Sequence, residues 1–390
     1  MFKGQYVFSQ ITDHLPLHTF RRCVERYHGE RYVKQFRCFD QYLAMSFAQL
    51  THRESLRDIE ACLKAQSSKL YHMGLRSSIS RSTLADANEQ RDWRIYADFA
   101  QALIKIARPL YAGDELGLDL KNTVYALDAS TIDLCFSVFP WALFRSTKSA
   151  VKLHTLLDLR GNIPSFIHIS EGKLHDVNAL DMIIPEAGSF YVMDRAYLDF
   201  ERLFSLNNSG AFFVIRSKNN ILFKRRYSSP VEKTNGIRCD QTIRLTGLNT
   251  KNKYPKPLRR VKYHDNETNK TLNLLTNNEI IPAQTVADLY RYRWKVELFF
   301  KWIKQHLHIR TFFGTSENAL KSQIWIAISV YVLIAIIKKQ LKIKAELYTI
   351  LQVLSLTLFE KIPLEQLLGN NHYIEHTREN AIQLNLFDNL

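Results

Sequence analysis

Disulfide and zinc-binding patterns are missing from this sequence. Only five cysteines occur among 390 residues, they lie far apart, and no C-x-x-C pair is present. A secreted disulfide scaffold needs an even, regularly spaced set of cysteines, and a structural zinc site needs closely spaced pairs. The odd number and wide spacing therefore argue against both classes and indicate a reduced, cytoplasmic protein.

A stretch that is apolar for the full thickness of a membrane is also missing. The longest apolar run, from Ile324 to Ile337, has fourteen residues, whereas a transmembrane helix needs roughly twenty. We therefore expect a buried helix here and no membrane partner. The N-terminus has no basic segment followed by an apolar one, so export is not indicated.

Acidic residues are scarce relative to basic ones. The chain has 53 Lys and Arg against 38 Asp and Glu, which gives a formal net charge of +15. Between Arg216 and Lys262, fourteen basic residues accompany only Glu232 and Asp240. Such a density of positive charge is self-repelling unless an anion neutralises it, and a nucleic-acid backbone does so while releasing counterions. We therefore expect a nucleic-acid partner.

Hydrophobic periodicity divides the chain into three regions. Residues 1–115 are predicted to be helical, because apolar residues recur three and four positions apart. Within residues 76–94, a basic, Ser-rich segment leads into a helix that Ser82 or Thr83 can cap. This pattern is compatible with helix-turn-helix DNA binding and equally with any ordinary helix start. Residues 316–390 are also predicted to be helical.

The middle region, residues 116–315, has the pattern of an α/β domain. Three strands are expected first, namely TVYALD and a hairpin formed by VKLHTLLDL and SFIHIS. A helix that Asp176 would cap, the strand GSFYVMD, a second helix and the strand AFFVIR follow. This order predicts a mixed sheet flanked by helices. A β-rich, basic insertion is expected at about residues 216–276.

Two aspartates of this region end predicted strands. Asp128 and Asp194 each follow a short apolar strand, and open sheets bind ligands at the carboxyl ends of their strands. If the strands are neighbours, the two carboxylates share a crevice and repel each other unless a cation is bound. Oxygen ligands suit Mg²⁺ or Mn²⁺, and two such ions about 4 Å apart can promote attack on a phosphodiester. Taken singly, each aspartate is more often a turn or cap residue.

A third acidic residue, Glu297, stands in the segment LYRYRWKVELFFKWIKQHLHI. On a continuous helix it shares a narrow polar stripe with Tyr290, Arg293 and Lys304, while most other positions are apolar. The stripe is therefore expected to face an interior cleft, where Glu297 would join the two aspartates. The alternative is a surface helix on which Glu297 pairs with a basic residue one turn away.

The spacing of four residues in this segment resembles the Tyr-Arg-Glu-Lys signature of bacterial insertion-sequence transposases of the DDE type: Tyr290, Arg293, Glu297 and Lys304. Upstream, YALDAST and YVMDRAY are similar to that family's motifs for its first and second aspartates, here Asp128 and Asp194. The resemblance covers residues from about 120 to 310. It implies a ribonuclease-H-like core with a β-rich insertion before the glutamate. Ala196 is a departure, because the family more often has glycine at that position.

The resemblance also implies roles for individual residues. Two Mg²⁺ or Mn²⁺ ions would be bound by Asp128, Asp194 and Glu297. DNA phosphates would be held by Tyr290, Arg293 and Lys304, with further contacts from Arg195 and Tyr197. Family members commonly cut the second strand through a DNA hairpin and accommodate a displaced base on an aromatic ring. Trp294 and Trp302 are candidates for that ring, although their helix positions favour core packing.

Taken together, these patterns predict a DNA transposase that acts at the bacterial nucleoid. It would cleave double-stranded DNA at the ends of its insertion sequence and join the 3′ ends to target DNA in cut-and-paste transposition. Residues 1–115 would contribute to binding the ends. The family resemblance also implies a homodimer in the active complex, and residues 316–390 are a candidate interface for it. Two alternatives stay open: a metal-dependent DNA nuclease on the same core, and a catalytically inactive, transposase-derived DNA-binding repressor.

Overall fold

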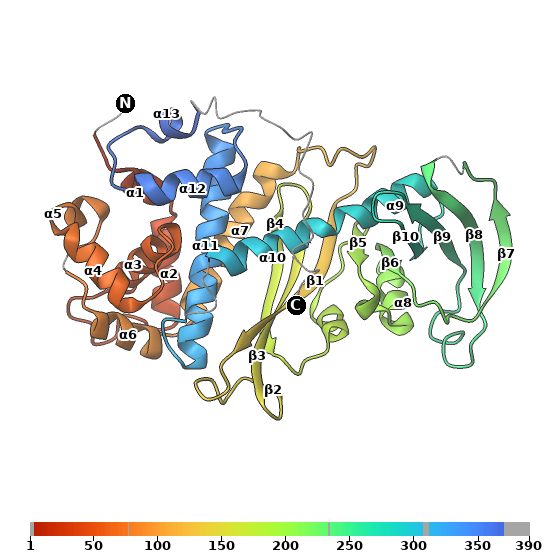
Figure 1. The fold of residues 1–390 in the computed structure, drawn as a ribbon, viewed down its shortest axis with the longest axis horizontal. Coiled ribbons are helices and arrows are strands. Elements are labelled where there is room, and N and C mark those ends of the chain that lie inside the picture. Colours follow the sequence, from red (N-terminus) through yellow and green to blue (C-terminus); the bar gives the residue numbers. More distant parts are fainter. Residues whose placement is uncertain (1–3, 77, 233–234, 307–311, 370–390) are drawn as a thin grey trace.

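The computed structural model describes residues 4–76, 78–232, 235–306 and 312–369. A helical half lies beside a long sheet, and two consecutive helices, α9 (Ala283–Tyr292) and α10 (Trp294–His306), run across that sheet (Figure 1). The other helices are α1 (Val7–Thr12), α2 (Leu17–Arg26), α3 (Cys38–Leu50), α4 (Leu56–Ala65), α5 (Ser67–Leu70), α6 (Arg81–Gln90), α7 (Arg94–Tyr111), α8 (Phe200–Asn208), α11 (Glu317–Gln340), α12 (Leu347–Thr357) and α13 (Leu364–Gly369).

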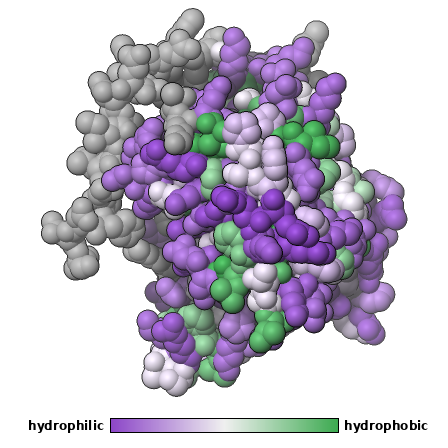
Figure 2. All heavy atoms as spheres, turned by 90° about the vertical axis from the view of Figure 1, so that its right-hand side faces the viewer, coloured by the Kyte–Doolittle hydropathy of each residue, from purple (hydrophilic) through white to green (hydrophobic). Residues whose placement is uncertain are grey.

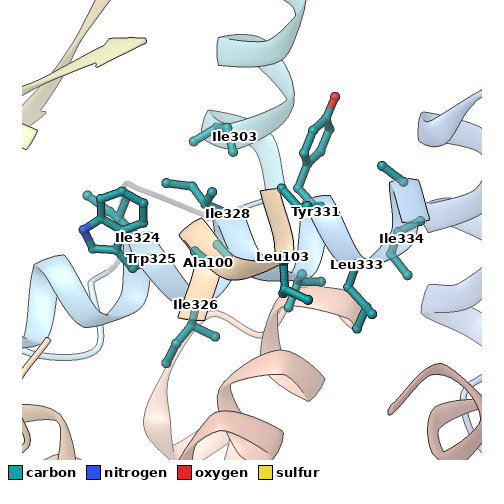
Figure 3. Close-up of a cluster of buried hydrophobic side chains, with 14 of the residues drawn as sticks. Ala100, Leu103, Ile303, Ile324, Trp325, Ile326, Ile328, Tyr331, Leu333 and Ile334 are labelled. Atoms are coloured by element: carbon teal, nitrogen blue, oxygen red, sulfur yellow. The ribbon is translucent and has the colours of Figure 1, made fainter. Parts of the chain in front are cut away.

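The centre of the helical half is α11, which contains the apolar run. Ser316 caps this helix by accepting a hydrogen bond from the backbone of Ala319, and two lysines, Lys338 and Lys339, complement the helix dipole in its last turn. Its side chains pack against Ala100 and Leu103 of α7 and against α10 (Figure 3). The N-terminal and C-terminal regions therefore share one hydrophobic core.

The length of the apolar run underestimated the length of α11, which could cross a membrane by length and composition. The helix has 24 residues, ten more than the apolar run, and is long and apolar enough to span a bilayer. However, 94% of its most apolar window is buried inside the protein, so the expectation of a buried helix is confirmed. The same burial means that α11 offers no surface for the predicted dimer.

The sheet contains ten strands: β1 (Val124–Leu134), β2 (Leu143–Arg145), β3 (Lys148–Asp158), β4 (Ile163–Glu171), β5 (Phe190–Met193), β6 (Phe212–Arg216), β7 (Phe223–Ser229), β8 (Ile237–Leu245), β9 (Leu258–Asp265) and β10 (Lys270–Thr276). Its core runs β4-β3-β1-β5-β6, with antiparallel pairing up to β1 and parallel pairing from β1 to β6. This topology is the predicted ribonuclease-H-like one. The predicted hairpin β3–β4 is also confirmed.

Central strands of the sheet are apolar on both faces because both faces are covered. Phe190, Val192 and Val214 belong to the core beneath α7 and α9–α11, whereas Tyr191 and Met193 belong to a second core beneath α8. Parallel strands buried on both faces are expected to be continuously hydrophobic, as β5 is. Two short 3₁₀ helices, η2 (Asp176–Met182) and η3 (Arg195–Tyr197), cover the α8 face close to β5.

The insertion is β-rich, as expected, and it extends the core sheet. β10 pairs with β6, and β9, β8 and β7 follow outward in that order. This end of the molecule presents a largely hydrophilic surface (Figure 2). The outermost strand, β7, exposes Lys224, Arg225 and Arg226, and charged side chains are a common device for protecting an edge strand. The basic residues of the insertion therefore include several that are accessible to an anionic partner.

Not every basic residue of the insertion is accessible. Arg259 is buried and donates to both carboxylate oxygens of Asp240, at 2.8 and 2.7 Å, and to the carbonyl oxygen of Ile281 at 2.6 Å. We expect Arg259→Ala to lower the free energy of unfolding by about 3 kcal/mol, because it leaves the Asp240 carboxylate buried without a counterion. Urea unfolding measures the change. Arg225→Ala on the exposed strand β7 is the control, with an expected change below about 0.5 kcal/mol.

One local prediction fails on the α8 face of the sheet. Asp176 does not cap the short helix that begins at its position, since η2 has no side-chain cap. Its carboxylate instead accepts a hydrogen bond from the ammonium group of Lys152 at 3.0 Å. The pairing holds η2 against β3, so a tertiary contact has replaced the local one that the sequence indicated.

Candidate active site

Asp128 and Asp194 occupy equivalent positions on neighbouring strands. The parallel pairing of β1 with β5 ends at Leu127 and Met193, and each aspartate is the next residue. Because Leu127 and Met193 face the core beneath α8, the alternation of a strand directs both carboxylates to the opposite face, toward α9 and α10. The predicted convergence of these two strand ends therefore has a structural basis.

The prediction that β1 ends at Asp128 is wrong. β1 continues to Leu134, paired throughout with β3, and only its pairing with β5 stops at Leu127. The two strands diverge at this point. Asp128 is therefore held within a paired strand, and its backbone cannot move without breaking the ladder with β3.

The predicted continuous helix is interrupted at its arginine. α9 ends at Tyr292 and α10 begins at Trp294, with Arg293 between them. The turn tightens there, since the backbone N–H of Arg293 bonds to the carbonyl of Tyr290 at 3.2 Å and the N–H of Val296 bonds to that of Arg293 at 3.0 Å. Bonds of this i→i+3 kind are typical of a 3₁₀ turn. The joint sets Arg293 over Asp128, within β1.

Arg293 links two of the three acidic residues. One Nη atom donates to Asp128 Oδ2 at 2.6 Å, and the other donates to Glu297 Oε1 at 2.5 Å. Arg293 and Asp128 are largely buried, whereas the Glu297 side chain is 57% exposed. Pairing of Glu297 with a basic residue one turn away was the alternative to a role beside the aspartates. That pairing is present in the structure, and the role beside the aspartates stays a prediction.

The site is electrostatically incomplete at Asp128. Burial raises the pKa of its carboxyl to about 6, Arg293 and the N–H of Ala129 oppose that rise, and the negative charges of Asp194 and Glu297 add to it. Both aspartates also use one oxygen locally: Asp128 accepts from Ala129 and Asp194 accepts from Ala196, so Asp194 does cap η3. Among the residues that the structure describes, Arg293 is the one cation ion-paired with any of these three carboxylates, which favours an additional cation.

The donors are suitable for a hard divalent cation in kind, although they are not gathered into a ligand set. They are all carboxylate oxygens, the ligands that Mg²⁺ and Mn²⁺ prefer. Within the described ranges of the chain, no group of three acidic, histidine or cysteine side chains is close enough to hold a metal ion. Arg293 is the cation between Asp128 and Glu297 in this structure.

The predicted DNA-contacting residues differ in accessibility. Arg195 and Lys304 are exposed, whereas Tyr290 of α9 is nearly buried, with 9% of its surface exposed. Tyr197 is a correction: it is 1% exposed and packs in the core beneath α8, so its hydroxyl does not face a DNA strand. Arg195 and Tyr197 lie on different sides of the 3₁₀ helix η3, so the first is exposed and the second is buried.

The two tryptophans of α10 also differ. Trp294 was expected to pack in the core but is 52% exposed. Trp302 lies against Tyr331 of α11, with the ring centroids 4.5 Å apart, as expected for core packing.

A basic residue that the sequence interpretation assigned only to the insertion lies beside the acids. Arg216 is the last residue of β6, directly after Ile215, which pairs with Met193 of β5. It therefore occupies on β6 the position that Asp194 occupies on β5. The signal was available in the sequence, since AFFVIR ends in a charged residue just as TVYALD and GSFYVMD do.

A ribonuclease-H-like sheet with carboxylates at the ends of its central strands is the framework of metal-dependent enzymes that cleave or join phosphodiester bonds. Within that class, the model of the transposase DDE domain matches residues 119–333. The chain belongs to this family, and it is therefore an enzyme of DNA cleavage and strand transfer, as the sequence resemblance predicted. A domain of unknown function, DUF4372, matches residues 3–76.

Relatives of the chain carry transposase names. It is 31% identical over 285 residues to a protein of Sinorhizobium fredii named as transposase y4zB, covering 71% of this chain and 77% of the relative. It is 32% identical over 218 residues to a protein of Geobacillus stearothermophilus named as the transposase for insertion sequence element IS5377, covering 55% and 57%. A solved piggyBac transposase synaptic complex with hairpin DNA aligns over 95% of this chain and 81% of that one, with 11% identity and a TM-score of 0.44.

Proposed function

We propose that this transposase binds the ends of its own insertion sequence, cleaves them with divalent metal and joins the freed 3′ ends to target DNA. In the first step, water adds to phosphorus and the 3′ oxygen leaves as a hydroxyl. In the second step, that hydroxyl attacks a target phosphodiester, whose own 3′ oxygen leaves. The observation that carries the proposal is the link from Arg293 to Asp128 and Glu297, beside the strand end that bears Asp194.

Asp128, Asp194 and Glu297 are the residues that would hold the ions, two Mg²⁺ or Mn²⁺ in this proposal. Such ions, when bound, activate the attacking oxygen and stabilise the charge on the leaving one. The fixed backbone of Asp128 within β1 and the cap that Asp194 forms on η3 orient these two carboxylates. Glu297 is the more exposed ligand, and it adjusts by side-chain rotation.

The cations around the acids would hold the DNA. Arg293 would transfer its two N–H groups from carboxylates to a phosphate, which a guanidinium binds in the same forked manner. Tyr290 lies beneath Arg293, with its ring centroid 5.8 Å from the guanidinium, and would follow its movement. Lys304 and Arg195 would contact the backbone on either side of the acids.

Two ends held together require two active sites, so we propose a homodimer in the complex with double-stranded DNA at the nucleoid. Since α11 is buried, the dimer surface in the C-terminal region would lie on α12 or α13. Leu356 of α12 is 85% exposed, which is consistent with a contact there.

Strand transfer tests the proposal and separates it from its alternatives. Purified protein would be incubated with a duplex that ends at the terminal inverted repeat flanking the coding region, with Mg²⁺, Mn²⁺ or EDTA. Cleavage with either ion, followed by joining of pre-cleaved ends to a plasmid, is the expected result. Cleavage without joined product would instead identify a nuclease. Binding with neither reaction would identify a repressor.

A further inference from the structure

Three neighbouring strands, β1, β5 and β6, stop pairing with one another at the same level of the sheet. β1 pairs with β5 through Leu127 and Met193, and β5 pairs with β6 through Met193 and Ile215. The residues that come next form a single row across the sheet: Asp128, Asp194 and Arg216. Each member of the row lies on the strand next to that of its neighbour.

Arg216 points to the same face as the aspartates. Val214 belongs to the core beneath α9 and α11, and Ile215 belongs to the core beneath α8, so the alternation of the strand directs Arg216 toward α9. Its electrostatic neighbour there is Tyr290. Burial raises the pKa of this tyrosine, and the positive charges of Arg293 and Arg216 oppose that rise. Arg216 therefore lies at the site, at the end of the row.

The two arginines differ in how they are used. Arg293 is paired with two carboxylates. Among the residues that the structure describes, none forms an ion pair or side-chain hydrogen bond with the half-buried guanidinium of Arg216. A purely structural arginine at such a position satisfies its donors, as Arg259 does with Asp240 and Ile281. The N–H donors of Arg216 are thus available to a DNA phosphate, the anion that the proposed function brings to this site.

We propose that Arg216 is a phosphate-binding residue that holds the DNA phosphate next to the one that reacts. The inference rests on the proposed function, because it takes the two aspartates as the reacting end of the row. A strand whose reacting phosphate lies at Asp128 and Asp194 continues along the row toward Arg216, where a guanidinium donates a forked pair of hydrogen bonds to the next phosphate. Backbone contacts of this kind set the register of the DNA without reading its sequence.

The experiment combines Arg216→Ala with neutral methylphosphonates, placed one at a time at each phosphate near the cleavage position. Equilibrium binding of the terminal-repeat duplex is measured in Ca²⁺ by fluorescence anisotropy. Loss of a hydrogen bond to a charged group corresponds to an affinity loss of roughly tenfold or more. We expect the wild type to lose affinity at several positions, and Arg216→Ala to become insensitive at one position only, adjacent to the cleaved bond.

Arg238→Ala, which removes an exposed cation from β8, is the matched control and should keep the wild-type response at that adjacent phosphate. Arg216→Lys, which retains the charge without the fork, should recover part of the affinity, and thermal unfolding checks that each variant folds. If the affinity loss caused by Arg216→Ala adds to the loss caused by the methylphosphonate at every position, the inference is overturned. The proposed function is judged separately, by Mg²⁺-dependent joining in the wild type, so the two can fail independently.

Discussion

Asp128→Asn is expected to abolish cleavage and joining while leaving the protein folded. The substitution removes a carboxylate that would bind metal, and metal stabilisation of a phosphoryl-transfer transition state is worth several kcal/mol. A loss of about 1,000-fold, equivalent to ~4 kcal/mol, is therefore expected. The rate of strand transfer from pre-cleaved ends, measured with saturating DNA in Mg²⁺, tests it directly.

The same variant should lose activity but gain stability against unfolding. In the folded protein the pKa of Asp128 is raised by burial from 3.8 to about 6. Between these values the folded state binds more protons than the unfolded state, so the ionised carboxylate lowers stability as the pH rises through this window. Asparagine resembles the uncharged acid but loses part of the bond to Arg293. We expect Asp128→Asn to gain about 1–2 kcal/mol at pH 8 without divalent metal, and nothing near pH 4.

Asp133→Asn provides the matched control, because Asp133 lies on the same strand and is exposed. It should keep strand-transfer activity and show no pH-dependent gain in stability. Urea unfolding of the three proteins at pH 4, 6 and 8 in EDTA gives the comparison. An active Asp128→Asn protein would remove this residue from the proposed metal site. An inactive variant that is less stable at pH 8 would point to a structural defect instead.

The sequence predicted secondary structure correctly where a local pattern of apolar residues was sufficient to define an element. The central strands of the core were identified from short apolar runs, and burial on both faces explains why those runs lack polar alternation. Their order then restricted the topology to the observed one. The end of β1 was missed because its continuation past Asp128 depends on pairing with β3, which is a non-local contact.

In the candidate site, too, features with a local sequence signal were predicted and features without one were missed. The three acids were identified from strand ends and from a family signature, but the break at Arg293 was not, since nothing in the local sequence interrupts that helix. The exposure of Trp294, the first residue of α10, was also missed. Arg216 was overlooked because its charge was counted with those of the insertion, although the rule applied to the aspartates also applied to it.

Replacing Arg293 with alanine should weaken the metal-free protein and strengthen its affinity for metal. The change leaves Asp128 and Glu297 without their shared counterion, which costs several kcal/mol for a buried pair. Because Glu297 is 57% exposed, solvent screening reduces the expected loss to about 2 kcal/mol. A divalent cation then replaces the missing positive charge. We expect Mn²⁺ to bind the DNA-free variant roughly tenfold more tightly than the wild type and to restore its unfolding temperature.

The catalytic effect of the same change should be a loss. Without its guanidinium, the site lacks the forked contact to phosphate, and charge-assisted bonds of this kind are worth about 1.5–3 kcal/mol each. Strand transfer should therefore fall by roughly 100-fold even though metal binds more tightly. A gain in metal affinity together with a loss in activity would distinguish an arginine that exchanges carboxylates for DNA from one that only stabilises the fold.

Arg202→Ala is the control for this test, because Arg202 also bridges two carboxylates, Asp181 at 2.6 Å and Asp199 at 3.3 Å, away from the proposed metal site. Its loss should lower stability without raising the affinity for Mn²⁺, as measured by electron paramagnetic resonance of the free ion. If the Arg293 variant binds Mn²⁺ no better than the wild type does, the guanidinium and the metal do not compete. The acids would then have to be brought together by DNA itself, because no other described residue contributes a positive charge between Asp128 and Glu297.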